Sequence, residues 1–467
     1  MPPPMLSANL RVIQGVRLAD STSAWDISID YPPDSPHGVI SSVTPHDSPT
    51  GTHTAECPLV LPALTHPHIH LDKAFIHNAP RYANLLPCTG SFQEALSFTT
   101  KAKKQFTRAD LLERGEWLLA ESVSSGVTAM RAFVEVDHSV KWICLEAAVA
   151  LKSQWRDSCE IQIACFAQDP IFSSKYGEEN MHYIDEALQR YPQIDVIGTT
   201  PYVEFSIEAA KANIDWAIDC ALQFDKHLDF HIDYNLDPSK GVLVIYVLQG
   251  LQRRGWTTRS TRKRVMLGHC TRLTLAPVNV WTEISNLIHE HDLPVSFVGL
   301  PTSDVYMASP QGHDNSNGKP RGTLHIPDLI RQHRLDAVMG VNNVGNAFTP
   351  WGSADPLFLA CLGVGIYQAG TRGDADLLYE CVSTRARAAI GLSPISQGLG
   401  VHKGAQPDFL LFRDRDETGC GVSRVRASVA EVVWDPPARI SRDVVIDGRV
   451  KQSGSGGSDG DSMYRFA

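Results

Sequence analysis

The feature that most constrains the fold is an alternation of short β-rich runs with longer stretches of helical periodicity through the middle of the chain. The clearest helical stretches are RADLLERGEWLLAESVSSG and NIDWAIDCALQFDK. The eight β-rich runs cover residues 61–70, 127–136, 160–168, 194–205, 227–233, 264–270, 293–299 and 335–342. Strands that alternate with helices form parallel sheets, and eight such units predict a closed (β/α)8 barrel. An open doubly wound sheet is the alternative, but no glycine-rich dinucleotide fingerprint follows an early strand.

Both ends of the chain differ in character from the middle. LRVIQGVRL and AWDISID near the start, and PDFLLFRD, ASVAEVVWD and DVVIDGRV near the end, are short β-like runs separated by turn residues. The final stretch, KQSGSGGSDGDSMYRFA, is rich in glycine and serine, which predicts a flexible tail over residues 451–467.

Charge and composition argue against several classes of function. The 467-residue chain has a formal net charge of −10, and its one short basic cluster (253–264) is not the basic stripe of a nucleic-acid-binding protein. The start lacks the charged and apolar regions of a secretory leader, and no apolar stretch is long enough to cross a membrane. The ten cysteines are scattered without a C-x-x-C motif, which is typical of reduced thiols. We therefore expect a cytoplasmic protein that binds neither nucleic acid nor membrane.

The predicted strands place four histidines at one end of the barrel. HPHIHLD ends the first run with His68 and His70, which share one side of the strand because residues two apart point to the same face. His231 ends the fifth run and His269 the sixth. Catalytic residues of such barrels lie at the carboxyl ends of the strands, and imidazole is the commonest metal ligand. These four residues predict a metal site, whereas His66 lies one layer deeper and is expected to be a packed interior residue.

The same motifs carry a resemblance to a known family. VLPALTHPHIHLDKAF resembles the first-strand signature of the amidohydrolase superfamily. ACFAQDPI, DVIGTTPYVEF, LDFHIDYNLD, VMLGHCT and TPWGSADPL follow in the order of that family's segments, and the resemblance covers residues 55–415. Within the superfamily the chain most resembles bacterial-type cytosine deaminases and their relatives that act on triazine or pyrimidine rings.

This resemblance implies an architecture and a set of site residues. The architecture is a (β/α)8 barrel (61–397) with a small β-sandwich domain built from both termini (1–60 and 398–450). The cofactor is one divalent transition metal, zinc or ferrous iron, and the partner is a small-molecule substrate. The implied metal ligands are His68, His70, His231, the strand-8 residue Asn342 and His269, which is either a ligand or an adjacent base. Gln168 corresponds to the amide that reads the substrate ring, and Asn343 and Trp351 are expected to contact substrate. We also expect a homo-oligomer.

Two residues depart from the deaminase pattern. Those enzymes place a glutamate three residues after the strand-5 histidine and an aspartate at the end of strand 8, where this chain has Tyr234 and Asn342. An asparagine offers a carbonyl oxygen to a metal but cannot act as a base. Because both carboxylates are absent from these places, cytosine deamination in its usual form is not expected.

Strand 4 contains no lysine, so a carbamylated lysine cannot bridge two ions from that strand, and we expect a mononuclear site.

The sequence leaves three functions open. A three-histidine zinc site lowers the pKa of bound water to about 7, so hydroxide forms there without an aspartate base. Tyr234 and His269 are the candidates for proton transfer, and Asp233 is the candidate for orienting a metal-bound imidazole. The first hypothesis is a hydrolase that acts on the C–N bonds of a small cyclic amide, amidine or amino-heterocycle. The alternatives are a non-hydrolytic Lewis-acid enzyme, for isomerisation, cyclisation or elimination, and a catalytically silent relative.

Overall fold

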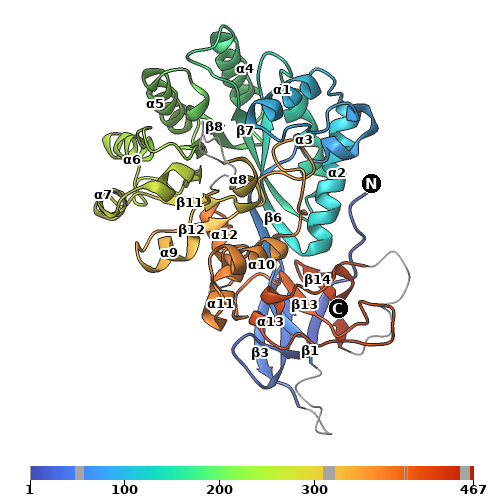
Figure 1. The fold of residues 1–467 in the computed structure, drawn as a ribbon. Helices are drawn as coiled ribbons and strands as arrows, with labels where there is room; N and C mark the ends of the chain where they lie inside the picture. The colour runs from blue at the N-terminus through green and yellow to red at the C-terminus, as the bar shows by residue number, and fades with distance from the viewer. Residues whose placement is uncertain (1, 48–56, 309–320, 394, 397, 453–462) are drawn as a thin grey trace.

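The structure is a computed structural model and describes residues 2–47, 57–308, 321–393, 395–396, 398–452 and 463–467. Eight parallel strands form a barrel, each paired with its neighbour in chain order (Figure 1). They are β5 (Leu64–His70), β6 (Val127–Glu135), β7 (Glu160–Ala167), β8 (Ile194–Thr199), β9 (His227–Ile232), β10 (Val265–His269), β11 (Val295–Gly299) and β12 (Ala337–Met339). Each of the eight predicted β-rich runs contains one of these strands, and the predicted (β/α)8 barrel is confirmed.

The barrel closes between its first strand and the segment that follows its last. Ile69 of β5 and Asn342 form a parallel bridge. The Asn342 N–H donates to the carbonyl of His68 at 3.0 Å, and the His70 N–H donates to the carbonyl of Asn342 at 2.8 Å. This pairing fixes Asn342 beside the two histidines that end β5.

Helices surround the barrel (Figure 1). The α-helices of this part of the chain are α1 (Phe92–Lys103), α2 (Arg108–Ser125), α3 (Ile143–Trp155), α4 (Gly177–Arg190), α5 (Ile207–Gln223), α6 (Val244–Arg253), α7 (Val278–Glu290), α8 (Pro301–Met307), α9 (Ile326–Arg331), α10 (Pro356–Ile366), α11 (Arg372–Glu380) and α12 (Thr384–Ala389). Short 3-10 helices are η2 (Ile76–Asn78), η3 (Pro80–Tyr82), η4 (Pro201–Val203) and η5 (Thr271–Leu275). Among the described residues no helix combines the length and apolar character needed to cross a membrane.

Helix α2 shows how the sequence sets these boundaries. The Thr107 side chain accepts a hydrogen bond from the Asp110 N–H and caps the first turn. Gly126 ends the helix with a φ of 105°, a left-handed conformation that favours glycine, and the chain turns directly into β6. The face between these caps buries Leu111, Leu118 and neighbouring apolar residues in the main core.

A second sheet of eight strands is built from both termini and lies beside the barrel (Figure 1). Its order is β15-β14-β13-β4-β1-β2-β3, with β16 paired to β1. The strands are β1 (Leu10–Arg17), β2 (Ala24–Asp30), β3 (Val39–Pro45), β4 (Leu59–Pro62), β13 (Phe409–Phe412), β14 (Arg442–Ile446), β15 (Arg449–Val450) and β16 (Tyr464–Phe466). The expected second β domain from both chain ends is therefore present, and its strands form one hydrogen-bonded sheet.

Strand alternation joins this terminal sheet to the barrel. On β4, Leu59 and Leu61 point into the main core, whereas Val60 points into the separate core of the terminal sheet. On β13, Leu410 packs into the main core and Leu411 into the core of the terminal sheet. Both strands therefore bury both faces, which explains their continuous apolar sequences.

Three features differ from the sequence expectations. ASVAEVVWD, interpreted as β-like, contains the helix α13 (Val429–Trp434), because Ser428 accepts from the Glu431 N–H and caps a turn that buries one face. The terminal sheet reaches past the predicted boundary at residue 60, since β4 ends at Pro62. Residues 453–462 of the predicted flexible tail lie outside the described residues, but Tyr464–Phe466 forms strand β16 and pairs with β1. A short 3-10 helix, η6 (Arg439–Ser441), precedes β14.

Candidate metal centre and active-site pocket

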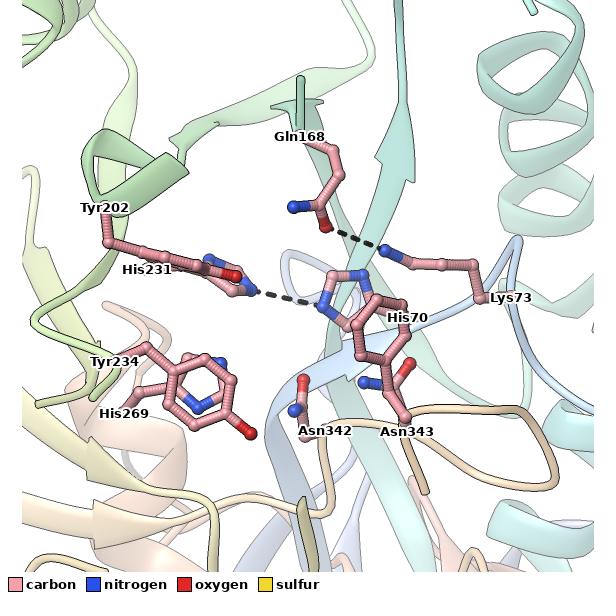
Figure 2. Close-up of a pocket in the computed structure, with 10 residues that line it drawn as sticks. His70, Lys73, Gln168, Tyr202, His231, Tyr234, His269, Asn342 and Asn343 are labelled. Carbon is pink, nitrogen blue, oxygen red and sulfur yellow. Dashed lines mark hydrogen bonds between the residues drawn. The ribbon is translucent and has the colours of Figure 1, made fainter. Parts of the chain in front are cut away.

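A pocket opens at the carboxyl ends of the barrel strands (Figure 2). It contains about 280 Å³ of space outside protein atoms, part of which is open to solvent. The residues that line it are His70, Lys73, Gln168, Tyr202, His231, Tyr234, His269, Asn342, Asn343 and Phe348. Most of the site residues expected from the sequence therefore meet in one cavity.

Three histidines converge at the base of this pocket. The Nε2 atom of His231 lies 3.0 Å from Nε2 of His68 and 3.1 Å from Nε2 of His70. All three side chains are buried, and one ligand atom from each lies within 4.8 Å of the other two. Ligand atoms about 2.1 Å from one zinc ion are separated by about 3.0 to 3.4 Å when they subtend 90–109° at the ion. The observed separations match that range.

Aromatic packing holds the imidazoles in this orientation. The Phe133 ring centroid lies 4.2 Å from that of His68, and the Phe166 centroid lies 4.4 Å from that of His231. Both phenylalanines come from the interior faces of β6 and β7 and are fully buried. The imidazoles therefore pack against an apolar aromatic wall that fixes their orientation.

Burial fixes the protonation state of these histidines. Desolvation lowers the pKa of His68, His70 and His231 well below the ordinary value, so the rings are neutral near pH 7. Among the described residues their Nδ1 atoms have no hydrogen-bond partner, and the nearest carboxylate oxygen to His68 Nδ1 is Asp229 Oδ1 at 3.7 Å. Neutral imidazoles that direct three Nε2 atoms at one point satisfy a cation better than they satisfy one another. The donor set therefore fits a transition-metal ion.

Asn342 supplies a fourth polar group beside this cluster. Its Nδ2 donates to the Ser303 hydroxyl at 2.8 Å, whereas its buried Oδ1 has no hydrogen-bond partner among the described residues. Asn342 also contacts the His68 and His70 imidazoles, where it partly opposes the lowering of their pKa values. An unpaired amide oxygen next to three neutral imidazoles is the arrangement expected of a further neutral ligand.

His269 lies beside the cluster but outside it. Its Nδ1 is 2.8 Å from Asp304 Oδ1, and its ring centroid is 5.3 Å from that of His231. Its ring stacks on Tyr234 with centroids 3.8 Å apart. The Asp304 carboxylate accepts from Nδ1, which leaves Nε2 available to the pocket. This geometry favours the second of the two roles considered for His269, an adjacent base, over metal ligation.

Tyr234 and Asp233 have different positions although they are adjacent in the chain. Tyr234 lines the pocket and donates to the Ser303 carbonyl at 3.3 Å, and burial raises its pKa well above the ordinary value, so it stays protonated. The Asp233 carboxylate instead accepts from the backbone N–H groups of Leu243 and Val244, at the start of α6. Burial raises its pKa to about 6. The expectation that Asp233 orients a metal-binding imidazole does not match this position, because strand β9 ends at Ile232.

Gln168 and Lys73 form the wall of the pocket that lies across from Tyr234 and His269 (Figure 2). Lys73 Nζ donates to Gln168 Oε1 at 3.0 Å, a contact drawn in Figure 2. The Lys73 ammonium also lies over the rings of Phe166 and Phe348, at 5.5 and 5.7 Å from their centroids. Tyr202 interacts with Gln168, and burial raises the pKa of its hydroxyl well above the ordinary value. The sequence had indicated Gln168 but not Lys73, Tyr202 or Phe348.

A buried ion network lies behind Lys73. Glu135 Oε1 is 2.8 Å from Lys73 Nζ, and Glu135 Oε2 is 2.6 Å from Lys103 Nζ. Lys103 is paired in turn with Asp137 and Asp169. Burial alone would raise the pKa of Glu135, but the ammonium groups of Lys103 and Lys73 lower it to about 2. Glu135 is therefore a structural carboxylate that holds Lys73 in the pocket wall.

The remaining expected residues divide between the pocket and its surroundings. Asn343 lines the cavity, and its Oδ1 accepts from Asn346 Nδ2 at 2.8 Å. Trp351 is 37% exposed, packs near Phe358 and is not among the lining residues. His66 Nε2 lies 3.1 Å from the Ser122 hydroxyl, one layer below the cluster, as expected of a packed interior residue.

Comparison with known proteins gives a clear result for the fold. No protein-family model and no curated protein matches the chain by sequence. Among solved structures, 5-methylcytosine deaminase from Klebsiella pneumoniae has a TM-score of 0.76 and 19% identity over 96% of this chain and 98% of that chain. N-isopropylammelide isopropylaminohydrolase from Burkholderia multivorans has a TM-score of 0.69 and 22% identity over 94% and 97%. An adenosine deaminase from Xanthomonas campestris with bound zinc has a TM-score of 0.59 and 16% identity over 97% and 94%.

These similarities span nearly the whole length of each chain, the terminal sheet included. The fold is therefore the barrel-plus-sheet architecture that these solved structures share. At such identities the similarity establishes the fold, and the chemistry must be argued from the residues of this chain.

Proposed function

We propose that the protein is a metal-dependent hydrolase of the amidohydrolase type, acting on a C–N bond of a small cyclic amide, amidine or amino-heterocycle. The observation that carries this proposal is the convergence of three buried imidazole nitrogens at 3.0 and 3.1 Å, at the base of a pocket with polar walls. The solved structures that share the fold are those of deaminases and an aminohydrolase, which supports the same class of reaction.

His68, His70 and His231 would hold one zinc or ferrous ion, with the amide oxygen of Asn342 as a further ligand. Such an ion supplies an electrophilic centre that lowers the pKa of water and polarises a carbonyl or amidine carbon. Four neutral donors leave the charge of the ion uncompensated, which strengthens this effect. One ion is expected, because strand β8 offers no lysine to bridge a second.

The chain's own residues bind substrate and move protons. Gln168 and Lys73 direct hydrogen-bond donors at one edge of a ring, and Phe348 packs beside them. The Asp304–His269 pair holds the imidazole so that Nε2 accepts a proton from water and later returns it to the leaving nitrogen. The Tyr234 hydroxyl, kept protonated by burial, turns from the Ser303 carbonyl to donate its hydrogen bond to charge that develops on substrate.

One observation favours the non-hydrolytic alternative. None of the ten residues that line the pocket is a carboxylate, although the deaminase pattern places two there. A site that polarises substrate without a strong base suits isomerisation or elimination as well as hydrolysis. Cytoplasmic location and homo-oligomerisation remain predictions from the sequence.

The proposed function is tested by assaying ammonia and amine release from a panel of amino-substituted pyrimidines and triazines, and ring opening of a panel of hydantoins and lactams. The assay compares protein as purified, protein stripped with a chelator, and stripped protein reloaded with zinc or ferrous iron. Activity that disappears on stripping and returns on reloading is expected. Release that is unaffected by stripping, and equally present in a His231→Asn variant, would contradict the proposal.

A further inference from the structure

We propose that the substrate of this pocket is an anion whose negatively charged oxygen binds to Lys73 and to the amide nitrogen of Gln168. This inference deepens the proposed function and rests on it for the identity of the pocket as the substrate site. It concerns the side of the pocket formed by Lys73 and Gln168, which lies across from Tyr234 and His269 in Figure 2.

The first argument is the hydrogen-bond inventory of Lys73. Its ammonium carries three protons, of which one is donated to Gln168 Oε1 at 3.0 Å and one is directed at Glu135 Oε1 at 2.8 Å. The third has no hydrogen-bond partner among the described residues, although Lys73 is only 1% exposed and lines the pocket. The Phe166 and Phe348 rings, 5.5 and 5.7 Å from the ammonium, attract it more weakly than a charged oxygen does, so a ligand acceptor in the cavity completes its hydrogen bonding.

The second argument concerns the orientation of Gln168. Its Oε1 accepts from Lys73, which turns its Nε2 toward Tyr202 and the cavity; one N–H of Nε2 serves the hydrogen bond with Tyr202, and the other is a donor for the ligand. Tyr202 adds a hydroxyl that burial keeps protonated. This wall therefore consists of donors, and the substrate edge that meets it must consist of acceptors, in contrast to the mixed edge of a neutral amidine.

The third argument is the charge of the pocket. The counter-ion of Lys73, Glu135, lies behind the wall and is shared with Lys103, so the ammonium faces the cavity and the carboxylate does not. Tyr234 and Asn342 occupy the two places where the deaminase pattern has a carboxylate. The Asp304 carboxylate accepts a hydrogen bond from His269 Nδ1. Lys73 and a bound divalent cation would both attract negative charge, and no lining residue repels it.

The charged oxygen has two chemical sources, an exocyclic carboxylate and a ring oxyanion, and the test separates them. Isothermal titration measures binding of uracil-6-carboxylate against uracil-6-carboxamide, and of barbiturate against uracil. Each pair has similar shape but differs in charge. Titrations are run with metal-loaded and with metal-free protein, because a bound metal also attracts anions.

We expect the native protein to bind the anion of at least one pair about tenfold or more tightly than its neutral partner in both metal states, as for a charge-assisted hydrogen bond. In Lys73→Met this preference falls below about threefold. Lys152→Met removes a partly exposed lysine paired with Asp195 and serves as the charge-matched control that keeps the preference.

Two results overturn the inference: equal binding within both pairs by native protein, or a preference that survives in folded Lys73→Met. If Lys73→Met does not fold because Glu135 has lost a partner, Lys73→Met/Glu135→Gln removes both charges, and the native comparison still decides the outcome. A protein that binds the anions but hydrolyses nothing refutes the proposed function alone. A protein that hydrolyses neutral rings and shows no anion preference refutes this inference alone.

Discussion

His231 is the residue on which the metal centre depends most directly. Its Nε2 lies within 3.1 Å of the Nε2 atoms of both other histidines, so it occupies the point at which the cluster meets. The substitution His231→Asn shortens the side chain and withdraws this nitrogen. We predict a large loss of zinc affinity, whereas His66→Asn, on the same strand as two of the ligands, leaves zinc affinity unchanged.

The size of the effect follows from the ligand count. Zinc binding by closed protein sites corresponds to about 10–16 kcal/mol, which is about 2.5–4 kcal/mol per ligand when shared among four. At about 1.4 kcal/mol per factor of ten, losing one ligand weakens binding by about 100- to 1,000-fold. His66→Asn loses a contact with Ser122, which costs stability but removes no ligand.

The assay is equilibrium competition for zinc against a chromophoric chelator, with circular dichroism to show that each variant is folded. His66 is a matched control, since the relative exposures of His66 and His231 are 0% and 2% and both substitutions leave similar voids. Added zinc should also raise the melting temperature of native protein and of His66→Asn, but not of His231→Asn. Equal loss of affinity in the two variants, or none in His231→Asn, would refute the assignment.

Three further predictions follow from other residues. Gln168→Ala should lower kcat/KM on the true substrate more than about tenfold, because it removes a buried hydrogen bond, and unchanged kinetics would place the ring elsewhere. Native protein should not release ammonia from cytosine at a useful rate, whereas Asn342→Asp with Tyr234→Glu should tighten metal binding; brisk native turnover would contradict this. Burial and nearby cations lower the pKa of His227 to about 3, whereas a histidine of the unfolded chain titrates near about 6.5. As the pH falls below about 6.5, only the unfolded chain takes up this proton, which favours unfolding. Between pH 7 and pH 5 the free energy of unfolding falls by about 2 kcal/mol because of this group. Denaturant titrations at the two pH values should show a loss smaller by this amount in His227→Gln, and an equal loss in both proteins would refute the assignment.

The barrel was predictable because each of its strands is bounded by turns and separated from the next by a helical stretch. The amphipathic pattern of α2 and its Thr107 and Gly126 caps are visible in the sequence and appear in the structure. ASVAEVVWD was misinterpreted because its valines suit a strand by propensity, while Ser428 and Glu431 supply a helix cap that outweighs this propensity.

The candidate site was predictable where side chains lie on regular strands. The positions of His68 and His70 follow from alternation along β5, and that of His231 from the end of β9. Asp233 was misplaced because alternation was extended one residue too far: its φ of 51° takes the chain out of the strand and turns the carboxylate toward α6. Left-handed residues of this kind cannot be recognised from alternation.

Lys73 and Asp304 were missed for a different reason. Lys73 follows the histidine motif on an irregular segment, and its place in the pocket depends on Glu135, which is distant in sequence. Asp304 lies on α8 and reaches His269 of β10 through the barrel's three-dimensional arrangement. A lysine after a metal motif or an aspartate in a short helix is usually a surface residue, so only the packed structure reveals these roles.

The central claim is that this site adds water across a C–N bond. The most direct test is to incubate metal-loaded protein, in water enriched in oxygen-18, with the panel compound that it consumes fastest, and to measure the product by mass spectrometry. We predict a product that gains one oxygen-18 atom, with an equal amount of ammonia or amine released if the C–N bond is exocyclic, or with ring opening if the bond lies in the ring. A product without the label, formed at the same rate, would contradict hydrolysis and establish non-hydrolytic chemistry at this metal centre.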